Sequence, residues 1–444
     1  MSTSRQAETA AGGRLRAPLF FALMAALIVL EGLTSSWNSA LGILNMGLLS
    51  AIMALGVNMQ WGYAGLFNAG AMGFVALGGL APVLISMPPT QGAFKAGGVG
   101  ILIAFAVATI AVIGAVWLYR TLKGRARGLA VALVLIIGFF VFRWVFDPAV
   151  AAIEAINPSA AGNLGGLGLP TLVSWPVGAL LAAGAAWLVG KIALGLRSDY
   201  LAIATLGIAE IVVAVLKNEQ WLDRGVLNVN GIPRPWPVPY EITLQNSPAF
   251  VSKMQAWGID PTQGSTLTVK LAFLLLFVVV IGVLLWFSEM ARRSPWGRMM
   301  RAIRDNEVSA AAMGKNVTRR HLQIFVLGSA VIGLAGAMMI SLDGQMTPSS
   351  YNPLRYTFLV LVMVIVGGSG SNWGSILGGL LIWYVWVKAG DWGPNIMALL
   401  ASPVPDGAFK QHMIDSAAHM RMLVMGGILL IVLRFSPRGL LPEK

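Results

Sequence analysis

Glu210 is the side chain of this sequence best placed to act chemically inside an apolar segment. It lies midway along the run LAIATLGIAEIVVAVL, which contains no cation. A carboxylate within a membrane span is costly, so by default it faces the bundle interior and marks a transport pathway or a structural ion pair. Gly207 and Ala214 fall on its helical face, which predicts a closely packed setting. A buried Glu that serves only the architecture is the alternative.

The sequence contains no set of residues suited to enzymatic catalysis. Cysteine is absent, and the 3 histidines are His321, His412 and His419. His412 and His419 would share a helical face, but no carboxylate lies at a ligand spacing on it. The nearest match to a phosphate loop, GAAWLVGKI at 184–192, has the wrong glycine spacing and Ile192 where Ser or Thr should bind magnesium. We therefore expect no catalytic site, metal or cofactor on this chain, and ATP hydrolysis only on partner chains.

Two polar and glycine-rich patches interrupt apolar runs, one at 58–65 and the other at 367–374. Non-helical backbone at membrane depth persists only where it is buried in protein or lines a wet cavity. Broken segments in both halves of a transporter often flank its pathway. The candidate pathway residues, all polar and all in or beside apolar runs, are Asn58, Gln60, Asn68, Thr205, Glu210, Ser369 and Asn372.

Small residues recur at four-residue spacing within the apolar runs. Such ladders let helices approach closely in lipid, where hydrophobicity gives no driving force for association. We expect them to serve packing. The ladders are Gly65, Ala69 and Gly73, then Gly333 and Ala337, then Gly374 and Gly378.

The composition is that of a membrane protein. Hydrophobic residues make up 57% and charged residues 11% of the chain, whereas about a quarter of a soluble domain is charged. Apolar runs that approach the length of a bilayer crossing predict an all-α, polytopic bundle of about 11 transmembrane helices, range about 10–12, with some broken or re-entrant segments. Residues 1–444 form a single transmembrane domain in this interpretation. The net charge of +13 lies in short loops beside these runs, which argues against a nucleic-acid partner.

The basic residues predict an orientation, because Lys and Arg beside membrane spans are retained on the cytoplasmic side. Traced from a cytoplasmic N-terminus, the clusters at 120–127 and 289–321 fall inside, as does the C-terminus. The complementary segments 218–268 and 389–420 are long and poor in Lys and Arg, so we expect extracytoplasmic loops there. Within the 289–321 loop, residues 301–314 have helix-forming composition, which suggests a docking surface for an energy-supplying partner.

Four stretches of the sequence carry a family pattern. They are ALGVNMQWGYAGLFNAGAMGF at 54–74, SDYLAIATLGIAEIV at 198–212, the stretch 294–338 that contains RAIRDNEVSAAAMGKN, and LVMVIVGGSGSNWGSILGG at 361–379. Together and in this order they resemble the LivM-type permease subunit of ATP-binding cassette (ABC) importers for branched-chain amino acids. The resemblance implies a subunit of the bacterial inner membrane, with a LivH-type second permease, two ATPase subunits and an extracytoplasmic substrate-binding protein as partners. It also implies a coupling helix that contacts an ATPase and contains Arg304, Asp305, Asn306, Glu307, Ala311 and Gly314.

The sequence departs from that pattern in places. The coupling segment lacks a Glu-Ala-Ala triplet, and Ala71 stands where the family commonly has His or Tyr. Other departures lie toward the outer face, where substrate is handled, so a permease for urea or short-chain amides is one alternative. A secondary transporter powered without an ATPase is another, although it would typically pair ionisable residues within its spans, and little beyond Glu210 is present. A membrane enzyme would need an acid, base or nucleophile set that is absent.

Overall fold

The computed structural model describes residues 2–158, 162–196, 198–403 and 405–443. Secondary structure within these ranges is almost entirely helical. The helices before the largest polar segment are α1 (Ser2–Thr34), α2 (Trp37–Ala64), α3 (Ala71–Ser86), η1 (Phe94–Gly98), α4 (Val99–Thr121), α5 (Arg125–Glu154), α6 (Thr171–Ala193) and α7 (Ser198–Asn218). The elements that follow are α8 (Gln220–Asp223), η2 (Gly225–Leu227), β1 (Val229–Asn230), α9 (Glu241–Gln245), α10 (Pro248–Ala256), α11 (Pro261–Arg293), α12 (Pro295–Asp305), α13 (Glu307–Ala312), α14 (Val317–Asp343), β2 (Gln345–Met346), η3 (Pro348–Ser350), η4 (Leu354–Phe358), α15 (Leu359–Gly367), α16 (Asn372–Ala401), α17 (Ala408–Asp415), η5 (Ser416–His419) and α18 (Met420–Phe435).

Nine helices within the described ranges are long and apolar enough to cross a membrane. They lie in α1, α2, η1 with α4, α5, α6, α7, α11, α14, and the region from α17 to α18. Two shorter apolar helices, α3 and η4 with α15, lie among them. The expected all-α, polytopic membrane bundle is thus confirmed.

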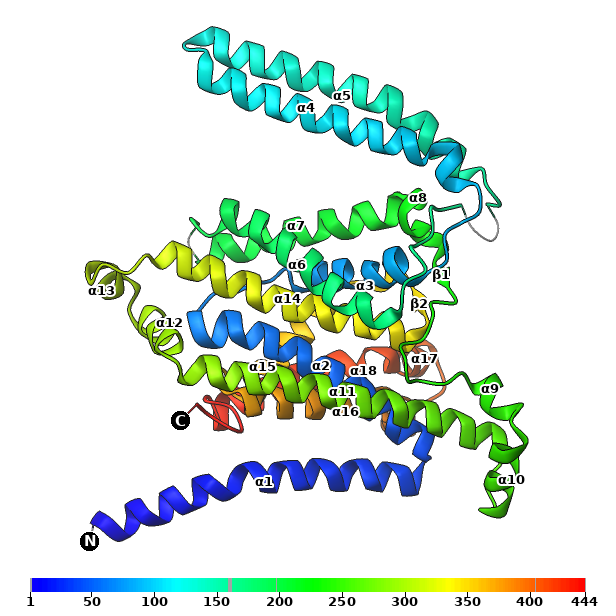
Figure 1. Ribbon diagram of the computed structural model, residues 1–444. Coiled ribbons are helices and arrows are strands. Elements are labelled where there is room, and N and C mark those ends of the chain that lie inside the picture. Colours follow the sequence, from blue (N-terminus) through cyan, green and yellow to red (C-terminus); the bar gives the residue numbers. More distant parts are fainter. Residues whose placement is uncertain (1, 159–161, 197, 404, 444) are drawn as a thin grey trace.

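Most of the long helices run roughly parallel or antiparallel, which gives the bundle two ends (Figure 1). One end carries α12, α13, the start of α1, the α4–α5 turn and the segment after α18. Because the arginine-rich clusters at 120–127 and 289–321 lie there, we call it the basic end. At the opposite end β1 pairs antiparallel with β2, with Val229 facing Met346, and this pairing joins the segment after α7 to the segment after α14.

The centre of the bundle is formed by α2 and α14. Of their apolar windows 78% and 72% are buried, whereas none of the other candidate spans among the described residues exceeds 33%. Glycines allow the neighbouring helices to approach. A Cβ added to Gly78 of α3 would lie 1.9 Å from the Gly333 carbonyl oxygen of α14, and one added to Gly333 would lie 2.4 Å from Ala182 Cβ of α6. Helices α3, α6 and α14 therefore meet at nearly backbone contact.

The ladders of small residues mostly serve packing, as expected. A Cβ on Gly73 would lie 2.8 Å from Ala209 Cα, and one on Gly378 would lie 1.9 Å from the Met363 carbonyl oxygen. Gly65 differs, because it ends α2 in a left-handed conformation with φ of 70°. Glycine adopts that conformation without steric cost, which makes it the usual residue after a helix end.

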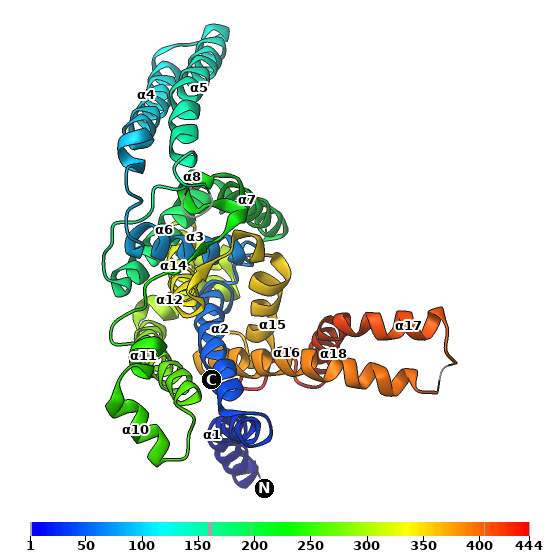
Figure 2. The ribbon, with the colours of Figure 1, turned by 90° about the vertical axis from the view of Figure 1, so that its right-hand side faces the viewer.

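Two helical hairpins project from the bundle, one formed by α4 and α5 and the other by α16 with α17 and α18 (Figure 2). The second differs from the loop expected at 389–420. Helix α16 continues to Ala401, and α17 begins at Ala408. The scarcity of Lys and Arg in this segment was compatible with a helix as well as with a loop.

The two interruptions expected in the apolar runs have different outcomes. The chain does break between α15 and α16, at 368–371. In contrast, α2 stays helical through Asn58 and Tyr63 and ends only at Ala64, so the interruption expected at 58–65 is wrong for most of that patch. The polar side chains of α2 find hydrogen-bond partners on neighbouring segments, and its backbone therefore has no need to unwind.

Candidate functional site

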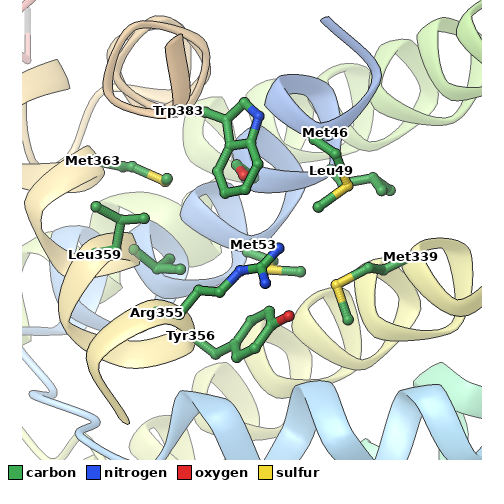
Figure 3. A pocket seen from close by; sticks show the side chains of 11 residues that line it. Met46, Leu49, Met53, Met339, Arg355, Tyr356, Leu359, Met363 and Trp383 are labelled. Atoms are coloured by element: carbon green, nitrogen blue, oxygen red, sulfur yellow. The ribbon is translucent and has the colours of Figure 1, made fainter. Parts of the chain in front are cut away.

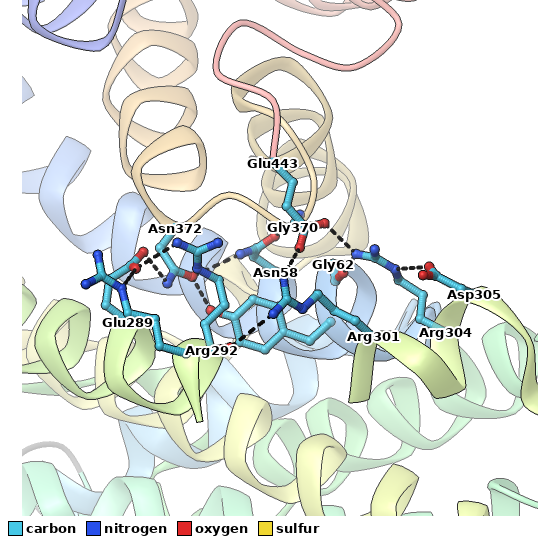
Figure 4. Close-up of polar contacts among 12 residues, drawn as sticks. Asn58, Gly62, Glu289, Arg292, Arg301, Arg304, Asp305, Gly370, Asn372 and Glu443 are labelled. Atoms are coloured by element: carbon cyan, nitrogen blue, oxygen red, sulfur yellow. Dashed lines mark hydrogen bonds and ion pairs between the residues drawn. The ribbon is translucent and has the colours of Figure 1, made fainter. Parts of the chain in front are cut away.

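The basic end of α2 meets the α15–α16 break in a junction of buried polar side chains (Figure 4). The Gly370 N–H donates to Asn58 Oδ1 at 2.7 Å, and Asn58 Nδ2 donates to Asn372 Oδ1 at 3.3 Å. The Tyr63 hydroxyl also donates to Asn372 Oδ1. Asn372 Nδ2 in turn donates to Glu289 Oε1 at 3.0 Å, at the end of α11. Two of the predicted pathway residues, Asn58 and Asn372, are thus brought into contact over a separation of 314 positions.

Charged side chains surround this junction. Glu289 forms an ion pair with Arg292 at 2.9 Å, with both side chains largely buried. A cavity of about 330 Å³ opens beside them, and its lining includes Glu289, Arg292, Asn372 and Glu443. The junction therefore borders space at the basic end of the bundle.

Arg304 connects α12 to the same junction. Its guanidinium donates to the Gly62 carbonyl oxygen near the end of α2 and to Glu443 Oε2 at 2.8 Å. Asp305 lies 3.2 Å from Arg304 Nε on the more exposed side. Burial alone would lower the pKa of Arg304, but the hydrogen bond and charge of Glu443 outweigh burial and raise that pKa.

A second polar network holds α2 to α14 and to the start of α3. Gln60 Nε2 donates to the Phe325 carbonyl oxygen and to Ser329 Oγ, both at 2.9 Å. Gln60 Oε1 accepts from Asn68 Nδ2 at 2.9 Å. Gln60, Asn68 and Ser329 are all buried.

Thr205 extends this network to α7. Asn68 Oδ1 accepts the Gly70 N–H at 2.9 Å, and Thr205 Oγ1 accepts the Ala69 N–H at 3.2 Å. A Cβ on Gly70 would lie 2.2 Å from the Thr205 carbonyl oxygen, so the α2–α3 connection lies directly against α7. The polar side chains of both networks form hydrogen bonds mainly with one another and with the backbone. In this conformation they hold the ends of neighbouring helices together.

The other two predicted pathway residues lie outside these networks. Ser369 is exposed at the tip of the α15–α16 break. Glu210 is also exposed, which corrects the expectation that it faces the bundle interior. The predicted close packing around it is likewise absent, since Gly207 and Ala214 are exposed and a Cβ on Gly207 would meet nothing within 4 Å. The cause is the position of α7, an outer helix that packs against the bundle through its opposite face.

A small cavity lies between α2, α14, η4, α15 and α16 (Figure 3). The Arg355 guanidinium points into it between two aromatic rings, with its carbon 5.1 Å from the Tyr356 centroid and 5.4 Å from the Trp383 centroid. The cavity volume of about 10 Å³ has room for no more than one water. In this conformation it is too small for an amino acid. Its remaining lining residues are Met46, Leu49, Ser50, Met53, Met339, Leu359, Val360 and Met363.

The expected coupling helix is divided into α12 and α13. The division falls at Asn306, whose backbone is extended and whose Oδ1 accepts the Ser309 N–H at 2.9 Å, so that it caps α13. Glu307 is the first residue of α13, and Gly314 follows its end with φ of 76°. The helix-forming composition of 301–314 therefore predicted a helix correctly but did not predict the division at Asn306. Asn favours the N-cap position over the helix interior, and so a new helix begins after it.

α13 and Met313, the residue directly after it, expose apolar side chains at the basic end. Val308 is 80% exposed and Met313 is 79% exposed, and Ala311 is exposed between them. On the inner side, Ala310 packs with Ile303 of α12 and other apolar residues in a small separate cluster. The six-residue helix is therefore held from within and presents an apolar surface outward.

Beyond the spans, Asp223 in α8 is buried with Oδ2 lacking a hydrogen-bond partner. Burial raises its pKa to about 7, although the Gly225 N–H bonded to Oδ1 opposes the shift. No group of three or more acidic or histidine side chains in the described part of the chain could hold a metal ion.

Sequence reasoning missed three participants in the junction, namely Tyr63, Glu289 and Glu443. The two acids had a detectable signal, because each is an acidic residue within or beside a strongly basic segment. Their partners, Asn372, Arg301 and Arg304, are distant in sequence and could not be assigned from spacing.

Comparison with known proteins gives a consistent family. A family model described as "Branched-chain amino acid transport system / permease component" matches residues 129–433, more than half of the chain. The high-affinity branched-chain amino acid transport system permease protein LivM of Salmonella typhimurium is 28% identical over 295 residues, covering 66% of this chain and 61% of that protein. A probable LivM of Methanocaldococcus jannaschii is 27% identical, covering 66% of this chain and 74% of that protein.

A more distant match is the fructose import permease protein FrcC of Rhizobium meliloti, 27% identical over 32% of this chain and 39% of that protein. No solved structure matches the chain significantly. Because the family model covers more than half of the chain, including α12 and α13, the chain belongs to the family of permease components of branched-chain amino acid transport systems.

Proposed function

We propose that this chain is one of two membrane subunits of an ABC importer that moves branched-chain or other hydrophobic amino acids across the bacterial inner membrane. Separate ATPase subunits supply the energy, and an extracytoplasmic binding protein delivers the substrate. The observation that carries the proposal is the exposed apolar α13 at the basic end, in a chain of the branched-chain amino acid permease family.

The docking site for an ATPase subunit is α12 with α13. Val308 and Met313 are large apolar side chains that lie outside the membrane spans and are exposed to about four fifths. An exposed apolar patch on a soluble surface commonly marks an interaction site. Arg304 and Asp305 add charged groups beside the patch, and Gly314 allows the chain to turn away after it.

The transport pathway lies along the exposed face of α7, where this subunit meets a second permease of LivH type. Glu210 supports this arrangement because a carboxylate within a span is too costly to face lipid alone. Ile203, Gly207, Glu210 and Ala214 form one exposed stripe, and the small residues permit close approach of another helix.

The substrate class follows from the named relatives, which are branched-chain amino acid permeases. Urea and short-chain amides are the rival substrates. Competition against labelled leucine uptake separates these classes, because isoleucine and valine should compete and urea should not.

The orientation places both termini and the basic end in the cytoplasm. Since the chain has no cysteine, single cysteines can be labelled without background. Lys315→Cys, next to α13, should react only in permeabilised cells, whereas Gln255→Cys in α10 should react in intact cells. Labelling of Lys315→Cys in intact cells would reverse the orientation and remove the docking site from the ATPase.

The docking proposal is tested by charged substitutions on α13 and at the residue that follows it. Val308→Asp and Met313→Asp should each reduce retention of the ATPase subunit by about tenfold or more, because they place a charge in an apolar contact. Val226→Asp is the matched control, since Val226 is also exposed but lies in η2 at the opposite end. Equal ATPase retention by all three variants would refute docking at α13.

A further inference from the structure

The segment that follows α18, residues 436–443, returns to the α15–α16 break. The Leu440 N–H donates to the Val366 carbonyl oxygen at 2.8 Å, and the Leu441 N–H donates to the Gly367 carbonyl oxygen at 2.9 Å. These carbonyls end α15, where a helix has no internal donors left for them. The post-α18 segment therefore completes the hydrogen bonding of α15, and Leu441 is buried in the main core.

The contact leaves little freedom for this segment to shift. A Cβ on Gly368 would lie 2.6 Å from the Leu441 carbonyl oxygen, and one on Gly374 would lie 3.0 Å from the same atom. A Cβ on Gly439 would lie 2.3 Å from Gly368 Cα. The backbone of the post-α18 segment is thus in direct contact with the chain on both sides of the break at 368–371.

Beyond this contact, Glu443 reaches α12. Its carboxylate lies 2.8 Å from an Arg304 guanidinium nitrogen and 3.5 Å from an Arg301 guanidinium nitrogen (Figure 4). The side chains of Glu443 and Arg304 are 19% and 27% exposed, so the pair is partly shielded from water. Charge-assisted hydrogen bonds of this kind are stronger than neutral ones.

Gly370, in the α15–α16 break, connects Glu443 to the junction with α2. Gly370 lies against the Glu443 carboxylate, since a Cβ added to it would be 2.5 Å from Oε2. Its N–H is the group that donates to Asn58 Oδ1 in the junction. An uninterrupted series of contacts therefore runs from α12 through Arg304 and Glu443 to the broken helix.

We propose that Glu443 is a positioning residue that links the ATPase-docking helix α12 to the α15–α16 break. Displacement of α12 moves Arg304, and Arg304 moves Glu443 with the post-α18 segment that caps α15. The break then shifts with the docking helix, and the hydrolysis cycle is passed to the membrane part. This inference rests on the proposed function, because it requires an ATPase docked at the basic end.

The test is Glu443→Gln in the complete transporter, reconstituted in liposomes with its ATPase and second permease subunits. Glutamine keeps the shape and removes the charge. We expect normal assembly and near-normal basal ATP hydrolysis, with about a tenfold loss of substrate-stimulated hydrolysis and of leucine imported per ATP hydrolysed. Arg438→Gln is the matched control, because Arg438 is an exposed cation of the same segment, and it should behave like the unaltered protein.

Two further measurements keep the inference falsifiable. Arg304→Gln combined with Glu443→Gln should be no worse than the poorer single variant, because both changes break one link. If Glu443→Gln reduces only membrane abundance or melting temperature, and each assembled complex still imports the usual amount per ATP, the linking role is overturned. Unchanged stimulation in Glu443→Gln overturns it as well. Failure of the unaltered complex to bind the ATPase or to import would refute the proposed function itself.

Discussion

Gly62→Ala tests the contact between α2 and the α15–α16 break. A Cβ at position 62 would lie 2.2 Å from Asn58 Oδ1 and 2.4 Å from the Gly370 backbone nitrogen. Both atoms belong to the 2.7 Å hydrogen bond that joins α2 to the break, so the methyl group must push them apart.

The expected cost can be worked from these contacts. Overpacking costs about 1–3 kcal/mol and the lost hydrogen bond about 1 kcal/mol, while alanine gains about 1 kcal/mol in helix propensity over glycine. The net loss of stability is therefore about 1–3 kcal/mol. Gly282→Ala in α11 is the control, because a Cβ there meets nothing within 4 Å, and it should be neutral or slightly stabilising.

The assay is the apparent melting temperature of each purified variant in detergent, followed by substrate-stimulated ATP hydrolysis in the assembled complex. Gly62→Ala should melt below both the unaltered protein and Gly282→Ala, and it should lower the stimulation. Equal melting temperatures for Gly62→Ala and Gly282→Ala would refute the close contact.

Three further predictions concern buried or uncompensated charges. Burial raises the pKa of Asp223 to about 7, so the folded chain keeps a proton that the unfolded chain releases, and stability falls as pH rises from about 4 to about 7. Asp223→Asn should therefore raise the melting temperature at about pH 8 and leave it nearly unchanged at about pH 4. An effect that does not depend on pH would contradict this. Lys388 forms a 2.6 Å ion pair with Glu31, and the two side chains are 8% and 3% exposed. Lys388→Met should therefore lower the stability by about 3–5 kcal/mol, because it leaves a buried charge without its partner. The double variant with Glu31→Gln should melt at a higher temperature than Lys388→Met alone, and the reverse order would argue against a buried pair. Glu210→Gln should preserve assembly and impair uptake, and normal uptake kinetics would remove Glu210 from the pathway.

Much of the bundle could be predicted from the sequence because apolar runs and basic loops are strong local signals. The run lengths gave the helices, and the basic clusters fell at one end as the alternation of spans requires. The Gly/Ser/Asn patch at 367–374 located a true break. In contrast, α2 carries an equally polar patch without breaking, because its polar groups are satisfied by partners remote in sequence.

The candidate site was only partly predictable for the same reason. Asn58, Gln60, Asn68, Thr205 and Asn372 were recognisable as polar residues in apolar runs, and they do lie in buried networks. The partner that each of these residues contacts depends on how the helices pack, and the spacing of residues along the chain does not predict that packing. Glu210 shows the limit most directly, because periodicity defined its helical face but could not say whether that face points inward or outward.

The measurement that tests the central proposal most directly is uptake of labelled leucine into liposomes that contain this chain, its second permease and its ATPase subunits, with binding protein outside. The account predicts uptake that requires enclosed ATP and the ATPase, stops when α13 carries Val308→Asp, and is competed by isoleucine and valine but not by urea. Uptake driven by an ion gradient without ATP, or competition by urea alone, would contradict it.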